Sequence, residues 1–528
     1  MIKDKRWEKL YPDYIQKEIV ISNRTIPEIL AQTVINFPQN PAILYKNQVW
    51  TYEELKLKVD AFASALQQNG FGKGDRAAIM LPNCPEYLVA YFGILTVGGI
   101  VVQINPLYTE RELQYVIQDS GTETIVTLRT LTNLVEAVKA NTTIKHMILV
   151  HSSEPFADNS FEKFIEGGTG KVIPVAINPA EDLAVLQYTG GTTGRSKGVM
   201  LTHRNIIANI EQEYEANKSF FIPGKEKILA VIPLFHVYGM TLIMISGVMQ
   251  GSCLILIPRF DPEEVLNIIK HEKPTRFPSV PTMFMALNAH PNFKDASWES
   301  IKFYQSGSAP MPVEFIHEFE RATGAKIIEG YGLTEASPAV TIQSFVKRKF
   351  GSVGIPMPNT NCKIVDLETG TREMPPGGSG ELIIQGPQIM KGYWNMPEET
   401  ALALRDGWLY TGDIAQMDED GYITIVDRKK DMIIVSGFNV YPREVEEVLY
   451  EHPSVREAAV IGVSDPYRGE TVKAILVLKD DVQTTEEEIK AHCKKNLAPY
   501  KVPKIFEFRS ELPKTNVGKI LRKALKEH

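Results

Sequence analysis

Residues 184 to 201, AVLQYTGGTTGRSKGVML, set the architecture that we expect of the chain. The first five residues have the pattern of a buried β-strand, and the closing VML has that of a second strand. The loop between them is rich in glycine and threonine and carries an arginine and a lysine. Glycine lets backbone N–H groups turn inward at dihedral angles that other residues avoid, and hydroxyl and cationic side chains add donors. The stretch therefore predicts a phosphate-binding loop between two strands.

The loop does not match the common nucleotide-binding patterns. A Walker A loop ends in Gly-Lys-Ser/Thr, whereas Gly194 is followed here by Arg195, Ser196 and Lys197, and the spacing GxGxxG is absent from the loop. A flexible surface loop is the alternative, but such loops mix glycine with serine, asparagine or proline. Because the loop joins strands rather than opening a helix, we expect a phosphate site of another class.

Helical and strand patterns alternate on both sides of this loop. TYEELKLKVDAFASALQQNG (51–70) predicts an amphipathic helix with a capping box formed by Thr51 and Glu54, and RAAIML (76–81) predicts a buried strand. A helix is expected after VML, from about Asn205. This alternation predicts α/β layers around mostly parallel sheets.

The chain of 528 residues is too long for one hydrophobic core, which stops growing at roughly 250 to 300 residues. Short strands and tight turns predict a β-rich subdomain over about residues 351–427, and the residues that follow have a compact α+β pattern. We therefore expect an N-terminal domain over 1–427, a hinge over 428–430 and a small C-terminal domain over 431–528.

Composition excludes several classes of protein. Lys+Arg of 57 against Asp+Glu of 64 gives a formal charge of −7, so no global positive field attracts nucleic acid. The four cysteines are far apart and form no CxxC pair, which excludes zinc ribbons and thioredoxins and favours a reducing cytosol. The charged N-terminus has no apolar region typical of a secretory signal. We expect a cytoplasmic protein.

Two uncharged apolar segments approach the length of a membrane span. Residues 237–258 are interrupted by Gly247 and Gly251, and residues 88–104 are interrupted by Gly98 and Gly99. A helix, a turn and a buried strand explain each segment better than a span does. Peripheral contact with a membrane stays open.

Seven further segments extend the pattern of the loop along the chain. They are PLFHVYG (233–239), YQSGSAP (304–310), EGYGLTEAS (329–337), DGWLYTGD (406–413), DRKKD (427–431), SGFNVYP (436–442) and PKTNVGK (513–519). In this order they resemble the adenylate-forming superfamily of acyl-CoA synthetases, luciferases and peptide-synthetase adenylation domains, over essentially the whole chain. The segments after residue 406 look most like those of bacterial medium- or long-chain fatty acyl-CoA ligases.

This resemblance implies a two-step reaction. A carboxylic acid attacks the α-phosphorus of ATP with Mg²⁺ to give an acyl-adenylate and pyrophosphate, and coenzyme A then takes the acyl group. A carboxylate is a poor nucleophile toward a polyanion, so the protein must neutralise charge and align the reactants. ATP, Mg²⁺ and coenzyme A are therefore the expected cofactors.

The resemblance also assigns the nucleotide contacts. Residues expected around the β- and γ-phosphates are Thr189, Gly190, Gly191, Thr192, Thr193, Gly194 and Lys197. Ser196 replaces a proline common in relatives, which implies a slightly looser loop. Tyr331 is expected to stack on adenine, in a pocket lined by Ser308, Ala309 and Pro310. Asp413 and Arg428 are expected to hold the ribose.

Four residues are assigned to the chemistry itself by the same resemblance. Glu335 is the expected Mg²⁺ carboxylate, and Thr334 and His236 are expected to contact the α-phosphate. Lys519 is expected to bridge the α-phosphate and the attacking carboxylate, where a positive charge stabilises the transition state. Outside these motifs, Glu335, His236 and Lys519 would be interpreted as a solubilising glutamate, a core histidine and a solvated lysine.

The position of Lys519 implies movement between the two steps, because coenzyme A must later reach the same acyl carbon. Lys430 matches the pivot position of the family. Gly437 matches the residue beside the pantetheine channel, where a side chain would block the thiol. The C-terminal domain is therefore expected to be mobile.

The substrate is less well specified. Acetate-activating relatives have a tryptophan where this chain has Gly332, so acetate is disfavoured, and FHVYGM (235–240) offers no carboxylate for an amino-acid ammonium group. A medium- or long-chain fatty acid is the first hypothesis, and an aryl acid of the benzoate or coumarate type is the second. A ligase that loads a carrier protein, a light-emitting oxygenase and a non-catalytic acyl sensor are kept as other classes, although a sensor would be expected to lack Lys519 or Glu335. A homodimer stays open.

Overall fold

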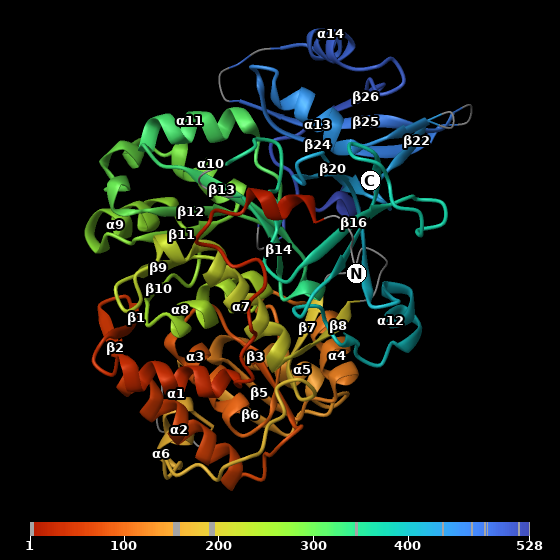
Figure 1. Ribbon diagram of the computed structural model, residues 1–528. Helices are drawn as coiled ribbons and strands as arrows, with labels where there is room; N and C mark the ends of the chain where they lie inside the picture. Colours follow the sequence, from red (N-terminus) through yellow and green to blue (C-terminus); the bar gives the residue numbers. More distant parts are fainter. Residues whose placement is uncertain are drawn as a thin grey trace.

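The described residues of the computed structural model contain four β-sheets. Three of these sheets lie below a smaller lobe, which contains the fourth (Figure 1). The structure describes residues 5–151, 159–189, 196–343, 347–435, 438–465, 468–479, 482, 484–515 and 518–526. One hydrophobic core joins the two large sheets, a second cluster covers the other face of one of them, and the residues after 432 form clusters of their own.

The first large sheet contains the strands around the predicted phosphate loop. Its strand order is β18 (Gly392–Tyr393), β8 (Lys197–Thr202), β7 (Leu183–Thr189), β4 (Ile100–Gln103), β3 (Arg76–Met80), β5 (Thr124–Leu128) and β6 (His146–Val150). Strands β7, β4, β3, β5 and β6 run parallel, while β8 returns antiparallel to β7. The two predicted strands are therefore confirmed, while residues 190–195 of the loop between them lie outside the described residues.

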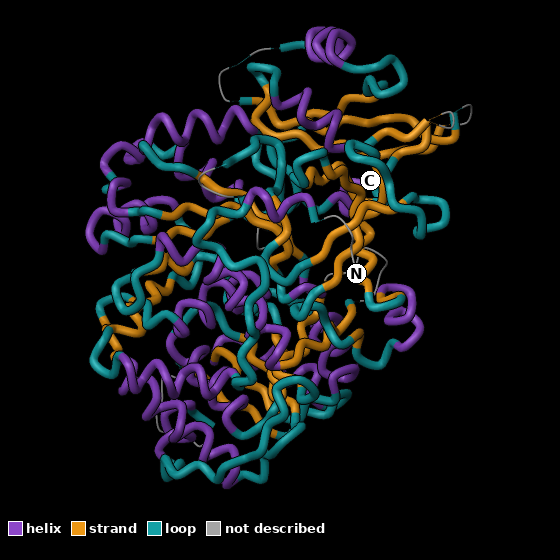
Figure 2. The backbone as a smooth tube through the Cα atoms, viewed as in Figure 1, coloured by secondary structure: helices purple, strands orange, loops and turns teal. Residues whose placement is uncertain are grey.

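The second large sheet is also mostly parallel. Its order is β15 (Ile355–Pro356), β14 (Ala339–Ile342), β13 (Ile327–Gly332), β12 (Phe303–Ser306), β11 (Arg276–Ser279), β9 (Lys227–Ala230), β10 (Cys253–Leu256), β1 (Pro41–Tyr45) and β2 (Gln48–Thr51). The strands from β13 to β1 are parallel, and the strands at both edges are antiparallel. The purple helices of Figure 2 cover both sheets.

The helices between these strands begin where the sequence indicates. Helix α2 (Tyr52–Gln68) starts with the predicted capping box, in which Thr51 and Glu54 bond each other's backbone N–H groups. The other helices of this part are α1 (Ile26–Asn36), α3 (Pro85–Thr96), α4 (Glu110–Ser120), α5 (Thr132–Lys139), α6 (Phe161–Glu166), α7 (His203–Asn217), α8 (Ser246–Met249), α9 (Pro262–Glu272), α10 (Pro281–Asn288) and α11 (Val313–Thr323). The predicted α/β layers are thus confirmed.

Both apolar segments fold inside the protein. Residues 88–104 form α3 followed by strand β4. Residues 237–258 form a π-helical turn, η4 (Gly239–Ile245), then α8 and strand β10. Among the described residues, no helix combines the length and apolar character that a membrane crossing needs. The interpretation as helix, turn and strand is confirmed.

The β-rich part contains short antiparallel strands, as predicted. They are β16 (Asn361–Val365), β17 (Ser379–Gln385), β20 (Trp408–Met417), β19 (Leu404–Arg405) and β21 (Ile423–Arg428), with α12 (Pro397–Ala403) alongside. Strands β15 and β18 also come from this stretch of sequence, but they pair with the two large sheets. The β-rich part of the sequence therefore contributes an edge strand to each of the two large sheets.

The remaining residues form an α+β lobe, blue in Figure 1, which we call the C-terminal lobe (described residues from 431 on). It contains β22 (Ile433–Val435), β23 (Phe438–Val440), α13 (Pro442–Tyr450), β24 (Val455–Asp465), β25 (Gly469–Leu478), α14 (Glu486–Asn496), β26 (Ile505–Phe508) and α15 (Arg522–Lys526). Pro442 stands at the first turn of α13, where its fixed φ suits the start of a helix. Strand β23 and the terminal helix α15 were not anticipated from the sequence.

Candidate active site

A cavity of about 690 Å³ lies where the two large sheets, the β-rich part and the C-terminal lobe meet. Parallel strands present their carboxyl ends at such a position, where α/β proteins commonly bind ligands. Predicted site residues that line it are Thr189, Lys197, His236, Ser308, Tyr331, Thr334, Glu335, Arg428, Lys430 and Lys519. Residues almost 330 positions apart in the sequence therefore converge on one cavity.

The base of the phosphate loop is closed by side chains. The predicted loop residues Gly190, Gly191, Thr192, Thr193 and Gly194 lie outside the described residues. At the base, Thr189 is the register partner of Lys197, and the Ser196 hydroxyl donates to the Thr189 carbonyl over 2.5 Å. The Tyr115 hydroxyl donates to the Ser196 carbonyl over 2.9 Å. Ser196 thus bonds the two strands together at the base of the loop, whereas the expected looseness concerns residues that lie outside those described.

Lys197 already has an anionic partner. Its ammonium group pairs with Glu399 of α12 and lies 4.9 Å from the centre of the Tyr393 ring. Glu399 is half exposed, so this ion pair is weak and an incoming phosphate can replace it. Neither Tyr393 nor Glu399 was selected from the sequence, although both lie within the segment YWNMPEET (393–400).

Thr334 and Glu335 lie in a short 3₁₀ turn, η7 (Thr334–Ala336), directly after β13. The Tyr393 hydroxyl donates to Glu335 Oε1 over 2.8 Å, which orients this carboxylate toward the cavity. One carboxylate with a nearby hydroxyl suits Mg²⁺, which keeps several waters and shares phosphate oxygens with its ligand. The described residues contain no cluster of three or more His, Cys, Asp or Glu that would enclose a metal without phosphate.

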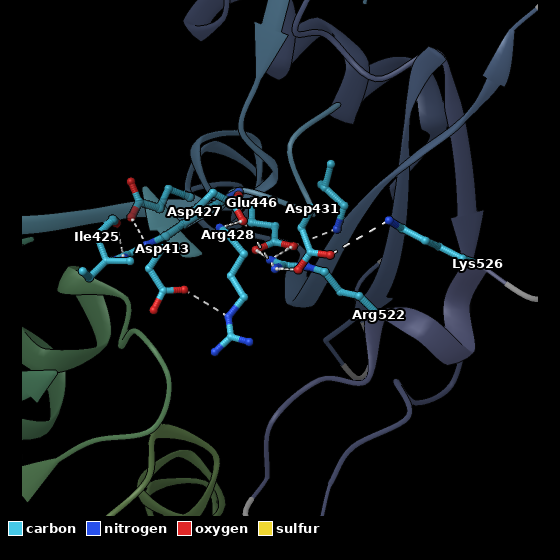
Figure 3. A network of polar contacts seen from close by, with 11 residues as sticks. Asp413, Ile425, Asp427, Arg428, Asp431, Glu446, Arg522 and Lys526 are labelled. Atoms are coloured by element: carbon cyan, nitrogen blue, oxygen red, sulfur yellow. Dashed lines mark hydrogen bonds and ion pairs between the residues drawn. The ribbon is translucent and has the colours of Figure 1, made fainter. Parts of the chain in front are cut away.

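The predicted ribose residues form a bonded set with the predicted adenine residue. Asp413 and Arg428 are direct register partners on β20 and β21, and Arg428 Nε lies 3.2 Å from Asp413 Oδ1 (Figure 3). The Tyr331 hydroxyl donates to Asp413 Oδ2, and burial followed by the Asp413 charge raises the pKa of Tyr331. Asp413 is 4% exposed and does not itself line the cavity, whereas both of its partners do.

Two residues of the predicted adenine pocket are not among those that line the cavity. Ser308 lines it and has a positive φ of 68°, whereas Ala309 and Pro310 do not line it. Gln305, Ser306 and Gly307 line this wall in their place, at the end of β12. The sequence motif located the wall to within three residues.

Apolar residues and a glycine also line the cavity. Val237, Tyr238 and Leu242 line it from the start of η4, and Gly332 lines it from the end of β13. A Cβ atom on Gly332 would lie 2.3 Å from the Pro338 carbonyl oxygen. Glycine is therefore required here by the close approach of β14, and a tryptophan at this position needs a different backbone path.

Lys519 lines the cavity from a loop of the C-terminal lobe, next to the bridge that closes this loop. Thr515 N–H donates to the Lys519 carbonyl over 2.7 Å, and Lys514 and Ile520 form an antiparallel bridge across the loop. The residue is exposed toward the cavity, yet protein groups on several sides desolvate its amine. This desolvation, followed by the Arg428 cation, lowers the pKa of Lys519 to about 8.

His236 stands across from this amine as a neutral group. Burial, and then the positive charge of Lys519, lower the pKa of His236 to about 4. The imidazole is therefore uncharged at neutral pH, and because its Nδ1 accepts from the N–H of Tyr238, its Nε2–H remains as a donor. Lys430 also lines the cavity, and burial lowers its pKa, whereas Gly437 lies outside the described residues.

We expect adenylation to decline at alkaline pH, because the lowered pKa of Lys519 lets the amine lose its proton there. With a pKa of about 8, the Lys519 amine of the free enzyme is mostly protonated at neutral pH. The protonated fraction falls to about a half at pH 8 and to about a tenth at pH 9. The kcat/KM for ATP, measured by pyrophosphate release, should fall accordingly, since this constant reports groups of the free enzyme. Lys519→Arg, which stays charged, should move the decline above pH 10. An alkaline limb unchanged by this substitution would assign it to another group.

Comparisons with known proteins agree along the whole chain. The family described as AMP-binding enzyme matches residues 30–394, and the AMP-binding enzyme C-terminal domain matches residues 444–519. A long-chain-fatty-acid–CoA ligase of Bacillus subtilis is 46% identical over 100% of this chain and 98% of its own length. A ligase of the same name from Escherichia coli O6:H1 is 40% identical over 99% and 98%. Among solved structures, ATP-bound MatB from Rhodopseudomonas palustris superposes with a TM-score of 0.88 at 30% identity, covering 96% of this chain and 99% of MatB.

Proposed function

This chain belongs to the AMP-binding enzyme family, and from that premise we propose that it activates a long-chain fatty acid with ATP and transfers the acyl group to coenzyme A. It is an AMP-forming acyl-CoA synthetase that uses ATP, Mg²⁺ and coenzyme A. The observation that supports the residue roles is the convergence of Lys519, His236 and Glu335 on one cavity.

In the first step, a carboxylate oxygen of the acid attacks the α-phosphorus, and the bond to the bridging oxygen of pyrophosphate breaks. We assign to Lys519 the neutralisation of charge between the carboxylate and the α-phosphate, and to neutral His236 a hydrogen bond to the same oxygens. Glu335 would hold the metal ion, and Thr334 would contact the α-phosphate. When bound, Mg²⁺ neutralises phosphate charge and helps to align the leaving group.

The nucleoside and the departing pyrophosphate are held by other residues. We assign the ribose hydroxyls to Asp413 and Arg428, and the adenine ring to Tyr331 and the wall that contains Ser308. We assign Lys197 and Thr189 to the outer phosphates together with the loop between them. In this assignment, phosphate binding displaces Glu399 from Lys197.

In the second step, the thiolate of coenzyme A attacks the acyl carbon, and the bond to the AMP oxygen breaks. The loop of Lys519 occupies the cavity as described, so we propose that the C-terminal lobe turns about residues 428–430 to admit the thiol. Gly437 is proposed to border the channel after this rotation. We propose the boundaries 1–427 and 431–528 for the two domains.

The substrate is tested by pyrophosphate release and thioester formation with octanoate, palmitate, benzoate and 4-coumarate. We expect the highest kcat/KM with palmitate, since the apolar wall formed by Val237, Tyr238 and Leu242 is suited to an alkyl chain. A higher kcat/KM with benzoate or 4-coumarate would identify an aryl acid as the preferred substrate. Pyrophosphate release without any thioester would favour a ligase that loads a carrier protein.

We also propose a location and an oligomeric state for the protein. The cysteines Cys84, Cys253, Cys362 and Cys493 are free and buried, which supports a cytoplasmic location. A homodimer is a proposal that sedimentation velocity on the purified protein would test.

A further inference from the structure

Asp427 lies at the border between the β-rich part and the C-terminal lobe. It is the penultimate residue of β21, directly before the proposed hinge, and is only 4% exposed (Figure 3). Its Oδ1 accepts from the N–H of Arg428 over 2.7 Å. Its remaining partners all belong to the C-terminal lobe, although Asp427 itself lies on the other side of the hinge.

The first of these partners is the beginning of helix α13. The first N–H groups of a helix lack partners within it, and a side-chain acceptor at the N-cap residue commonly supplies one. The N-cap residue of α13, Tyr441, makes no such bond. Instead, the N–H of Arg443 donates to Asp427 Oδ2 over 2.8 Å, and the Arg443 guanidinium donates to the Ile425 carbonyl over 2.6 Å. Helix α13 is thus capped from across the hinge.

The second partner is Arg522, three residues after Lys519. Arg522 Nη2 donates to both carboxylate oxygens of Glu446 over 2.8 and 2.7 Å, and Glu446 Oε1 also accepts from the N–H of Val460. These bonds fix Arg522 inside the C-terminal lobe. Its other nitrogen, Nη1, lies 3.7 Å from Asp427 Oδ1. The segment that carries Lys519 is therefore tied to the opposite side of the hinge.

We propose that Asp427 is a latch that holds the C-terminal lobe in the orientation in which Lys519 faces the cavity. This inference rests on the proposed function and on a hinge at residues 428–430. Rotation about that hinge carries Arg443 and Arg522 away while Asp427 stays with β21, so both contacts exist in this orientation alone. Asp427 is accordingly a positioning residue for the adenylation step.

Asp431 provides a matched control. Its Oδ2 lies 3.7 Å from the same Arg522 Nη1, and its Oδ1 lies 4.0 Å from Lys526. Asp431 follows the proposed hinge, however, so it moves together with Arg522. Loss of Asp431 removes a carboxylate at the same distance without removing a bond across the hinge.

The test compares Asp427→Ala with Asp431→Ala in the full-length enzyme. In Asp427→Ala we expect about a tenfold slower adenylation, measured by pyrophosphate release, with an unchanged rate of thioester formation from supplied palmitoyl-adenylate. Asp427→Asn, which keeps an acceptor for Arg443 N–H, should show a smaller loss. Asp431→Ala should leave the ratio of the two rates unchanged. An equal fall of both rates in Asp427→Ala, or an equal shift of the ratio in Asp431→Ala, would overturn the proposal.

Hydrogen exchange tests the latch without reference to catalysis. In the free enzyme, the amides at the start of α13 should exchange faster in Asp427→Ala than in the wild type, and Asp431→Ala should match the wild type. If exchange at this helix start is unaffected by Asp427→Ala, the latch is wrong. If the wild-type enzyme forms no adenylate from any acid while this exchange difference is present, the proposed function fails and the contact across the hinge stands.

Discussion

Lys519→Ala is expected to slow the formation of acyl-adenylate from ATP and palmitate by a factor on the order of 10² to 10³. The amine faces the cavity from the loop of the C-terminal lobe, and neutral His236 cannot replace its charge. Thioester formation from supplied palmitoyl-adenylate should stay within about threefold of the wild type, because the lysine leaves the site before that step. Pyrophosphate release and thioester formation, assayed separately, give the two rates.

Lys514→Ala is the control for this result. Lys514 belongs to the same loop and carries the same charge, but its amine is bonded to Glu457 of the C-terminal lobe over 2.8 Å. Its loss should change neither rate by more than about threefold, since a partly exposed ion pair contributes little. Equal losses of both half-reactions in Lys519→Ala would show that the residue supports the fold of the loop rather than the adenylation step.

The elements that the sequence predicted well are those that local patterns encode. The capping box of Thr51 and Glu54 begins α2, and the apolar run before Gly98 folds into α3. In each case the signal lies within a few residues of its structural effect. Motif order then predicted which distant segments share the cavity, because the motifs carry the resemblance.

The contacts that the sequence could not predict join residues far apart in the chain. Tyr393 orients Glu335 from 58 positions away, and Asp427 caps a helix that begins beyond the proposed hinge. Tyr393 does not stand out by type or spacing, and the segment DRKKD, which begins with Asp427, gives no sign of the helix that Asp427 caps. The pairing of β18 with β8 brings Tyr393 to the cavity, and such pairing depends on tertiary packing rather than on local propensity.

For Gly332, the sequence predicted the position correctly but gave only part of the reason for the glycine. Its place in the cavity wall agrees with the sequence expectation, which explained the glycine by the space that a longer acid needs. In the structure, a side chain at Gly332 would strike the Pro338 backbone before it reached the acid. The backbone path of β13 and β14, and not a missing side chain alone, therefore shapes this wall.

Asp413→Asn is expected to reduce both half-reactions together, by about 10² in kcat/KM for ATP and for supplied palmitoyl-adenylate. ATP and the adenylate carry the same ribose, so a residue that binds ribose hydroxyls serves both steps. The amide keeps the shape of the side chain but takes away the negative charge that pairs with Arg428 and accepts from Tyr331. Steady-state rates with each nucleotide ligand varied in turn give the two constants.

Asp418→Asn separates this effect from damage to the β-rich part. Asp418 follows β20, accepts from the N–H groups of Asp420, Gly421 and Tyr422 through Oδ1, and pairs with Lys349 through Oδ2. Asparagine keeps an acceptor but loses the charge that pairs with Lys349, so the substitution should lower the melting temperature and leave both kcat/KM values near the wild type. A fall confined to one half-reaction in Asp413→Asn would contradict the ribose assignment. Because Lys519→Ala should affect one step and Asp413→Asn both, the pair of variants distinguishes a group that visits the cavity from one that stays in it.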